Sequence, residues 1–162
     1  MDSQRLAGKN IMITGAAQGM GAANAKYFAA QGANVCIGDL NIEGVEKVAA
    51  EINASGNGKA VAVKMDVTNR QDNADAVTAT VEAFGSINVA LLNAGVNKPR
   101  MFMDIDEENW DMIMNINAKG VLLGMQEAAR AMIAQGPMDD HPYKIIPVGS
   151  IVSRTAFLDV IP

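Results

Sequence analysis

The sequence predicts an α/β fold, a doubly wound parallel sheet between two layers of helices, in one domain that covers residues 1–162. Two observations support this prediction. Short apolar runs alternate with segments of helical periodicity, at a spacing of roughly 30 residues that is typical of a strand and its following helix. Each apolar run is also followed by polar or glycine residues. Because the carboxyl ends of parallel strands meet at one edge of a sheet, these residues are expected to line a single crevice.

The composition fits one globular domain. A chain of 162 residues is long enough for one substantial core and too short for two comfortable ones. The net charge of −5 and the isoelectric point near 4.8 argue against binding to nucleic acid or to an anionic membrane. The segment Met1–Arg5 is polar, and no apolar run approaches about 18 residues. We therefore expect neither a signal peptide nor a membrane span, and a cytoplasmic location.

Cysteine and histidine are too rare to predict a metal site. Cys36 is the only cysteine and lies in an apolar run, which excludes a disulfide within the chain and predicts a buried thiol. His141 is the only histidine, lies in a polar loop, and is expected at the surface. The methionines are expected to pack in the interior. No metal is therefore predicted.

A glycine-rich turn after the first apolar run, Ile11–Ile13, is the most informative feature. Its glycines are spaced T-G-x-x-x-G-x-G, and a helix of small residues follows as far as Gln31. Such a turn exposes unpaired N–H groups and the positive end of the helix dipole, which favour a diphosphate. An ordinary tight turn is the alternative interpretation. The predicted contacts to a dinucleotide are Thr14, Gly15, Gln18, Gly19, Met20 and Gly21.

An acid follows the second apolar run. Asp39 comes directly after the segment Ala33–Gly38 and 18 residues after Gly21. A carboxylate at this place can accept both hydroxyl protons of an adenosine ribose and repels a 2′-phosphate. The predicted cofactor is therefore NAD rather than NADP, with Leu40 beside it.

The next elements are predicted from periodicity and turn residues. They are a helix, a strand, a helix and a strand over residues 42–52, 59–65, 71–84 and 87–92. Thr68 and Gln71 have the spacing of a capping box, and Gly85 is expected to end that helix. A long helix is expected to start at Asp104 or Asp106 and to end at residues 136–137.

The fifth strand is expected over Lys144–Val148, with Gly149 and Ser150 at its exit. Pro147 lies within this strand, although proline lacks the N–H that a central strand donates to its neighbour. The fifth strand is therefore expected to begin to unpair there or to be less central than the other strands.

Several motifs together resemble those of the short-chain dehydrogenase/reductase family, which has a variant of the Rossmann fold. They are the glycine turn with Asp39, the triplet Asn93-Ala94-Gly95, Asn117 within the segment WDMIMNIN, and Gly149-Ser150. The resemblance implies an NAD-dependent oxidoreductase that transfers a hydride between nicotinamide and a secondary alcohol or ketone. It also implies a Rossmann-type three-layer α/β/α domain and a homodimer or homotetramer.

The resemblance assigns roles to individual residues. It implies that Ser150 hydrogen-bonds the substrate oxygen, and that Asn117 interrupts a helix and supports a chain of water molecules. It places the backbone of residues 93–95 close to the cofactor, and Asp66 and Val67 beside the adenine. Asp66 has a second interpretation as a cap or first-turn acid of a helix. Ser153 is a weaker candidate for the substrate pocket.

Asn117 also has a simpler interpretation as a polar residue on an ordinary helix. Its spacing from Trp110, Ile113, Met114 and Val121 predicts that its side chain points into the apolar face of the helix. A buried amide there would require a hydrogen-bond partner.

The family's catalytic Tyr-x-x-x-Lys motif does not occur in the 162 residues. Four residues beyond Tyr27 and Tyr143 stand Gln31 and Pro147, and the family's spacing puts the tyrosine directly after Pro162. A nearby ammonium is needed because an unperturbed phenol, with a pKa of about 10, is a poor base at neutral pH. We expect the protein to continue beyond Pro162, so that the 162 residues lack the C-terminal part of the domain.

Two other interpretations remain open at this stage. The first is a truncated or catalytically inactive NAD-binding module. The second is a methyltransferase built on the same sheet, which Ser150 and the Asn93-Ala94-Gly95 triplet disfavour because its glycine turn needs no such partners.

Overall fold

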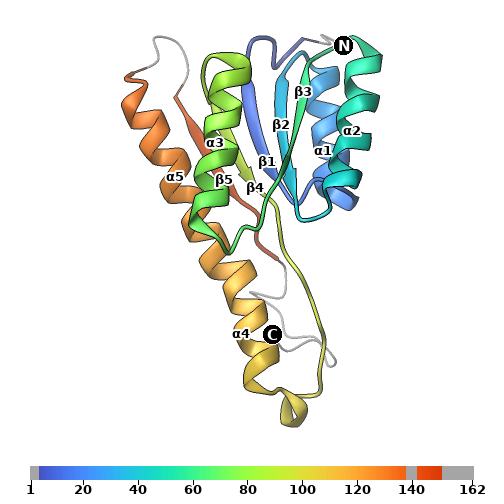
Figure 1. The fold of residues 1–162 in the computed structure, drawn as a ribbon, viewed down its shortest axis with the longest axis vertical. Coiled ribbons are helices and arrows are strands. Elements are labelled where there is room, and N and C mark those ends of the chain that lie inside the picture. Colours follow the sequence, from blue (N-terminus) through green and yellow to red (C-terminus); the bar gives the residue numbers. More distant parts are fainter. Residues whose placement is uncertain (1–3, 138–141, 151–162) are drawn as a thin grey trace.

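The sheet is fully parallel, as predicted. The computed structural model describes residues 4–137 and 142–150. Within them, five strands lie in the order β3-β2-β1-β4-β5, and every adjacent pair is parallel (Figure 1). The strands are β1 (Asn10–Thr14), β2 (Asn34–Asp39), β3 (Ala60–Lys64), β4 (Val89–Leu92) and β5 (Lys144–Pro147). The strand order reverses beside β1, between β2 and β4, which is where parallel α/β sheets bind their ligands.

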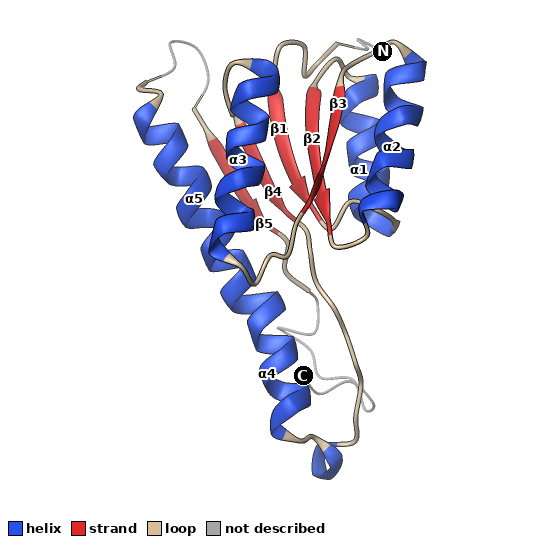
Figure 2. Ribbon diagram, viewed as in Figure 1, coloured by secondary structure: helices blue, strands red, loops and turns tan. Residues whose placement is uncertain are grey.

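Helices cover both faces of this sheet (Figure 2). The helices are α1 (Gly19–Ala30), α2 (Ile42–Ser55), α3 (Arg70–Phe84), α4 (Glu107–Met114) and α5 (Val121–Ala134). One apolar cluster joins α1 and α2 to the sheet, and a second joins α3 and α5 to it. The predicted three-layer α/β/α architecture is therefore confirmed.

The long predicted helix is a helical segment with an irregular centre. A π-helical stretch, Asn115–Gly120, joins α4 to α5, and α4 extends away from the sheet (Figure 1). Of the two predicted caps, Asp106 is the correct one, since its side chain accepts the N–H of Asn109 at 2.7 Å. Asp104 instead closes a short 3₁₀ helix, Phe102–Asp104.

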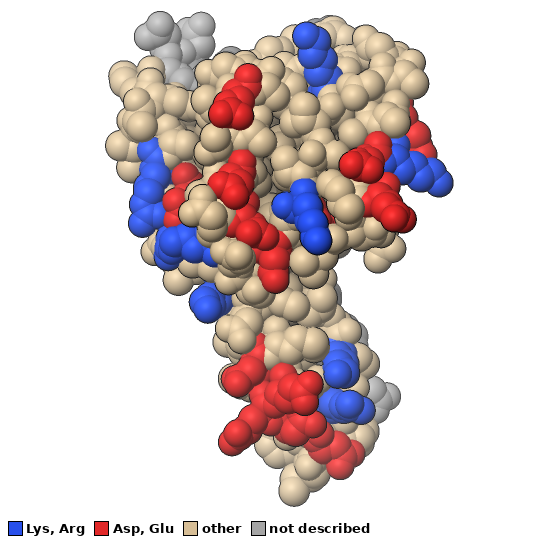
Figure 3. Space-filling view, in the orientation of Figure 1, with Lys and Arg blue, Asp and Glu red and all other residues tan. Residues whose placement is uncertain are grey.

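Acidic side chains gather over the α4 extension (Figure 3). Glu107 and Glu108 lie in the first turn of α4, next to its cap Asp106. Carboxylates at a helix N-terminus interact favourably with the helix dipole, so they stabilise the start of this helix. None of the helices within residues 4–137 and 142–150 is long and apolar enough to cross a membrane.

The predicted capping box of α3 is wrong. The cap is Asn69, whose side chain accepts the N–H of Gln71 at 2.9 Å. The Thr68 hydroxyl turns back and donates to Asp66 Oδ1 at 2.8 Å. A competing local hydrogen bond has therefore displaced the cap by one residue. The predicted end of this helix is confirmed, because Gly85 adopts the left-handed conformation with φ of 86°.

Pro147 is accommodated because β5 has a neighbour on one side only within the described sheet. The N–H groups of Lys144 and Val148 donate to carbonyls of Asn88 and Leu92 on the β4 side. Successive N–H groups of a strand point to opposite sides, so the nitrogen of Pro147 faces the outer edge. The missing N–H therefore removes no hydrogen bond to β4.

Candidate functional site

The glycine turn between β1 and α1 needs its glycines for two different reasons. Gly15 and Gly19 have φ of 67° and 56°, in the left-handed region that side chains rarely adopt. Gly21 is required by space, because a Cβ there would overlap the carbonyl oxygen of Gly15 and lie 2.7 Å from Asn93 Nδ2. A Cβ at Gly19 would meet nothing within 4 Å, so this part of the turn faces open space.

The first turn of α1 has no side-chain cap. Gln18 stands at the N-cap position, and its side chain accepts no N–H group of the helix. The starts of α2, α3 and α4 are capped by the side chains of Asn41, Asn69 and Asp106. The N–H groups of α1 are thus left for another acceptor, and the helix dipole favours a negatively charged one.

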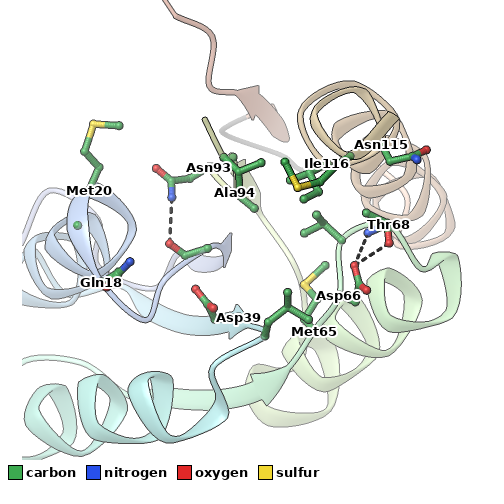
Figure 4. Close-up of a pocket in the computed structure, with 17 residues that line it drawn as sticks. Gln18, Met20, Asp39, Met65, Asp66, Thr68, Asn93, Ala94, Asn115 and Ile116 are labelled. Atoms are coloured by element: carbon green, nitrogen blue, oxygen red, sulfur yellow. Dashed lines mark hydrogen bonds between the residues drawn. The ribbon is translucent and has the colours of Figure 1, made fainter. Parts of the chain in front are cut away.

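The ends of β1 and β4 are joined by side-chain hydrogen bonds. The hydroxyl of Thr14 accepts the N–H groups of Asn93 and Ala94, both at 3.0 Å. Asn93 Nδ2 donates in return to the carbonyls of Thr14 and Gly15 at 3.1 Å, the second of which Figure 4 shows. Asn93 Oδ1 is buried and accepts no hydrogen bond from the part of the chain that the structure describes. These contacts fix the turn against the end of β4.

Asp39 lies at the end of β2 and is partly buried. Its Oδ2 accepts the N–H of Ala17 at 3.1 Å, and its Oδ1 accepts the N–H of Asn41 at 3.0 Å. Hydrogen bonds from two backbone N–H groups hold the carboxylate in one orientation. The acid is therefore fixed beside the glycine turn before any ligand binds.

A cavity of about 550 Å³ opens at the carboxyl edge of the sheet (Figure 4). It brings together all the predicted cofactor contacts except Thr14 and Gly21, which are buried and do not line it. The predicted residues that line it are Gly15, Gln18, Gly19, Met20, Asp39, Leu40, Asp66, Val67, Asn93, Ala94 and Gly95. The size of the cavity is within the range that small-molecule sites occupy.

Other lining residues were not predicted from the sequence. They are Met65, Thr68, Val96, Met112, Asn115 and Ile116. The last three come from α4 and from the π-helical stretch. Their spacing of three and four residues indicates one helix face, but the sequence does not show that this face meets the sheet edge.

Asp66 closes a local turn at the cavity wall. Its Oδ1 accepts both the N–H and the hydroxyl of Thr68, at 2.9 and 2.8 Å, and its own N–H donates to Asp72 Oδ2 at 2.8 Å. It does not cap α3, since Asn69 does. The interpretation of Asp66 as a helix cap is therefore wrong.

The predicted orientation of Asn117 is also wrong. Its side chain is exposed and hydrogen-bonds the backbone of Val96, accepting the N–H at 2.9 Å and donating to the carbonyl at 2.8 Å. The π-helical stretch changes the number of residues per turn, so spacing counted for an α-helix gives the wrong face. Asn117 thereby holds the loop after β4 and does not line the cavity.

The remaining candidates lie at or beyond the edge of the described structure. Ser150 follows β5, is exposed, and does not line the cavity. Ser153 and His141 lie outside the described residues. Within residues 4–137 and 142–150, three or more His, Cys, Asp or Glu side chains nowhere gather as a metal site would require.

Cys36 is buried in β2. Burial raises the pKa of its thiol to about 11, against the opposing effect of a hydrogen bond with Thr80. A thiol nucleophile needs a lowered pKa and access, so Cys36 is a core residue rather than a catalytic one.

A family model described as short chain dehydrogenase matches residues 9–161. The chain belongs to this family. Among curated relatives of this short chain dehydrogenase is the 2,5-dichloro-2,5-cyclohexadiene-1,4-diol dehydrogenase LinX of Sphingobium indicum, 37% identical over 99% of the chain and 59% of the relative. Another is the trans-4-hydroxycyclohexanecarboxylate dehydrogenase of Sinomonas cyclohexanicum, 40% identical over 96% of the chain and 60% of the relative. The chain thus spans about three-fifths of the length of these relatives.

Solved structures agree with the assignment of the fold. A short chain dehydrogenase from Mycobacterium smegmatis superimposes with a TM-score of 0.89 at 28% identity, over 97% of this chain and 65% of that one. A short chain dehydrogenase from Burkholderia cenocepacia, solved in complex with NADP, gives a TM-score of 0.73 at 35% identity, over 78% of this chain and 52% of that one. The predicted Rossmann-type fold is confirmed.

Proposed function

We propose that this short chain dehydrogenase binds NAD at the carboxyl edge of its sheet and that the whole protein is an oxidoreductase acting on a secondary alcohol or ketone. The observation that carries the proposal is the uncapped start of α1 beside the fixed carboxylate of Asp39. Bare N–H groups suit the diphosphate of a dinucleotide, and the cavity has room for it. Bound nicotinamide supplies the chemistry of hydride transfer.

The choice of NAD rests on charge beside the glycine turn. Asp39 and Leu40 line the cavity there, and no lysine or arginine is among its described lining residues. A 2′-phosphate would meet the carboxylate at close range without a compensating cation, whereas ribose hydroxyls can donate to it. Because the relative from Burkholderia cenocepacia was solved with NADP, the affinities of this chain for the NAD and NADP forms must be compared directly.

The substrate class is proposed from the relatives and from the exit of β5. Both named relatives are dehydrogenases of hydroxylated six-membered carbon rings. We assign the same class, an alicyclic secondary alcohol or its ketone, with the hydroxyl of Ser150 as the donor to the substrate oxygen. Asn117 contributes by holding the backbone of Val96 at the mouth of the cavity. A cytoplasmic location and a homo-oligomeric state stay predictions.

Calorimetric titration of the chain with NADH and NADPH tests the cofactor. We expect NADH to bind more tightly than NADPH, and Asp39→Ala to weaken NADH binding about tenfold while it narrows the difference between the two. Glu82→Ala is the matched control, since Glu82 is an exposed acid on α3 outside the cavity. Absence of heat with both cofactors, or tighter binding of NADPH, would contradict the proposal.

Turnover tests the reaction. A protein that spans the full length of the relatives is expected to form NADH from NAD and cyclohexanol derivatives. The rate of NADH formation is expected to fall when Ser150 is replaced by alanine. Cofactor binding without turnover of any ring alcohol or ketone would favour the inactive NAD-binding module instead.

A further inference from the structure

Asn73 is a polar side chain in the interior that neither the glycine turn nor the reaction accounts for. It lies early in α3 and is 0% exposed. An amide without water around it destabilises the fold unless its polar atoms are hydrogen-bonded. The partners of Asn73 therefore indicate what the amide does.

Both of its N–H donors reach the loop that joins β3 to α3. Asn73 Nδ2 donates to the carbonyls of Val67 and Asn69, at 2.9 and 2.7 Å. The peptide between Val67 and Thr68 is consequently held on both sides. Asn73 Nδ2 donates to the carbonyl of this peptide, on Val67, and Asp66 Oδ1 accepts the N–H of the same peptide, on Thr68, at 2.9 Å. A peptide fixed at both groups cannot rotate without losing two hydrogen bonds.

Two glycines, at the end of the π-helical stretch and in α5, allow these elements to pack closely against Val67 and Asn73. A Cβ at Gly120 would lie 2.9 Å from a Val67 methyl group, and one at Gly124 would lie 3.2 Å from Asn73 Oδ1. That Oδ1 is buried and accepts no hydrogen bond from any described residue. An apolar side chain of the same size would leave no such orphan atom, but it would remove the donor to the Val67 carbonyl, so the amide at this position is tied to the shape of the loop.

The loop that Asn73 holds forms part of the cavity wall. Asp66, Val67 and Thr68 all line the cavity. Asp66 and Thr68 lie on the side away from Gln18 and Met20 of the glycine turn (Figure 4). Oδ1 of Asp66 is occupied by Thr68, and Oδ2 accepts no hydrogen bond from the described residues. Oδ2 is thus the acceptor available to a ligand's amino group, provided that the loop keeps this shape.

We propose that Asn73 is a positioning residue for the adenosine half of the dinucleotide, acting through the Val67–Thr68 peptide. The inference rests on the proposed function, because it assumes that the cavity binds a dinucleotide. Asn73 itself touches no ligand. Its buried amide sets the backbone of the loop and, through it, the direction of the Asp66 carboxylate.

Replacement of Asn73 by leucine tests this assignment with two half-ligands. ADP-ribose carries the adenosine half, and nicotinamide mononucleotide carries the other half. Binding of each is measured by displacement of NADH from the folded chain. Asn73→Leu should weaken ADP-ribose about tenfold, which corresponds to the loss of one or two hydrogen bonds, and leave nicotinamide mononucleotide unchanged.

The matched control is Thr80→Val, which removes another buried polar group from α3. The Thr80 hydroxyl donates to the carbonyl of Ala76 at 2.7 Å and hydrogen-bonds the Cys36 thiol, so its described partners lie away from the loop that joins β3 to α3. Thr80→Val should leave the affinity for both half-ligands unchanged. Equal weakening of both half-ligands by Asn73→Leu, or unchanged affinity for ADP-ribose, would overturn the proposal.

A second variant, Asn73→Asp, covers the case in which Asn73→Leu does not fold. A protonated carboxyl group can donate one hydrogen bond to the Val67 carbonyl, whereas an ionised one repels it. ADP-ribose affinity of this variant should fall as pH rises from 5 to 8, more steeply than that of the wild type, which contains the same Asp66 and Asp72. Parallel pH profiles would contradict the assignment. Failure of the wild type to bind ADP-ribose, NADH and NADPH at all would instead contradict the proposed function.

Discussion

At the scale of single residues, Thr14 has the clearest structural role. Its side chain ends β1, and its hydroxyl accepts two backbone N–H groups from the segment that follows β4. Thr14 is 2% exposed, so water cannot replace the hydroxyl. One oxygen therefore ties together two strand ends that are 79 residues apart in the sequence.

Thr14→Val keeps the shape of the side chain and removes this acceptor. We expect the free energy of unfolding to fall by roughly 2 kcal/mol, because two backbone donors lose their partner in a partly buried place. Urea denaturation measures the change. Thr14→Ser keeps the hydroxyl and should stay within about 1 kcal/mol of the wild type. A valine variant as stable as the serine variant would show that the hydroxyl does not join the two strands.

Residue patterns with a local cause could be predicted from the sequence. The positions of Gly15, Gly19 and Gly21 follow from backbone geometry and close approach, which any turn of this kind imposes. The place of Asp39 follows from the end of its strand. The role of Asn73 could not be predicted, because residue types do not show that its amide is buried and turned toward the backbone carbonyls of Val67 and Asn69. Nothing in the sequence near it marks an amide that holds a loop.

At the scale of elements, periodicity predicts the regular strands and helices, whereas only the family resemblance at Asn117 indicates the irregular centre of the long helix. Apolar periodicity marks all five strands and the helices between them. The π-helical stretch Asn115–Gly120 has more residues per turn than an α-helix. Asn117 hydrogen-bonds Val96 on a different segment, and that contact is invisible in the periodicity.

The contact between the π-helical stretch and the loop after β4 gives a second prediction. Asn117→Leu removes both hydrogen bonds to Val96. Hydrogen exchange at the Val96 amide should become at least about tenfold faster, since local opening then no longer breaks a bond. Overall stability should change by less than about 1 kcal/mol, because the contact is exposed. Asn115→Leu is the control, two residues earlier on the same stretch. Equal exchange rates of the Val96 amide in both variants would show that the Asn117 side chain does not hold the loop after β4.

At the scale of the whole molecule, the cavity lies where the parts of the fold meet. One apolar cluster supports α1 and α2, and a second supports α3 and α5. Ala16 of the glycine turn and Ile37 of β2 belong to the first cluster, and Val67 packs against the second. A dinucleotide that contacts both sides would bind only when both are folded against the sheet. Its binding free energy is therefore added to the stability of the entire domain.

This coupling predicts stabilisation by the cofactor. At an NADH concentration of 100 times Kd, the free energy of unfolding should rise by about 2.7 kcal/mol, and the thermal midpoint by roughly 5–10 °C. Asp39→Ala with tenfold weaker binding should show about half of that gain at the same concentration. Differential scanning calorimetry with and without NADH makes the measurement, and inorganic pyrophosphate serves as the control for a general anion effect. An equal shift with pyrophosphate would show that only the start of α1 is engaged. An unchanged midpoint at the same NADH concentration would show that NADH does not bind the folded domain.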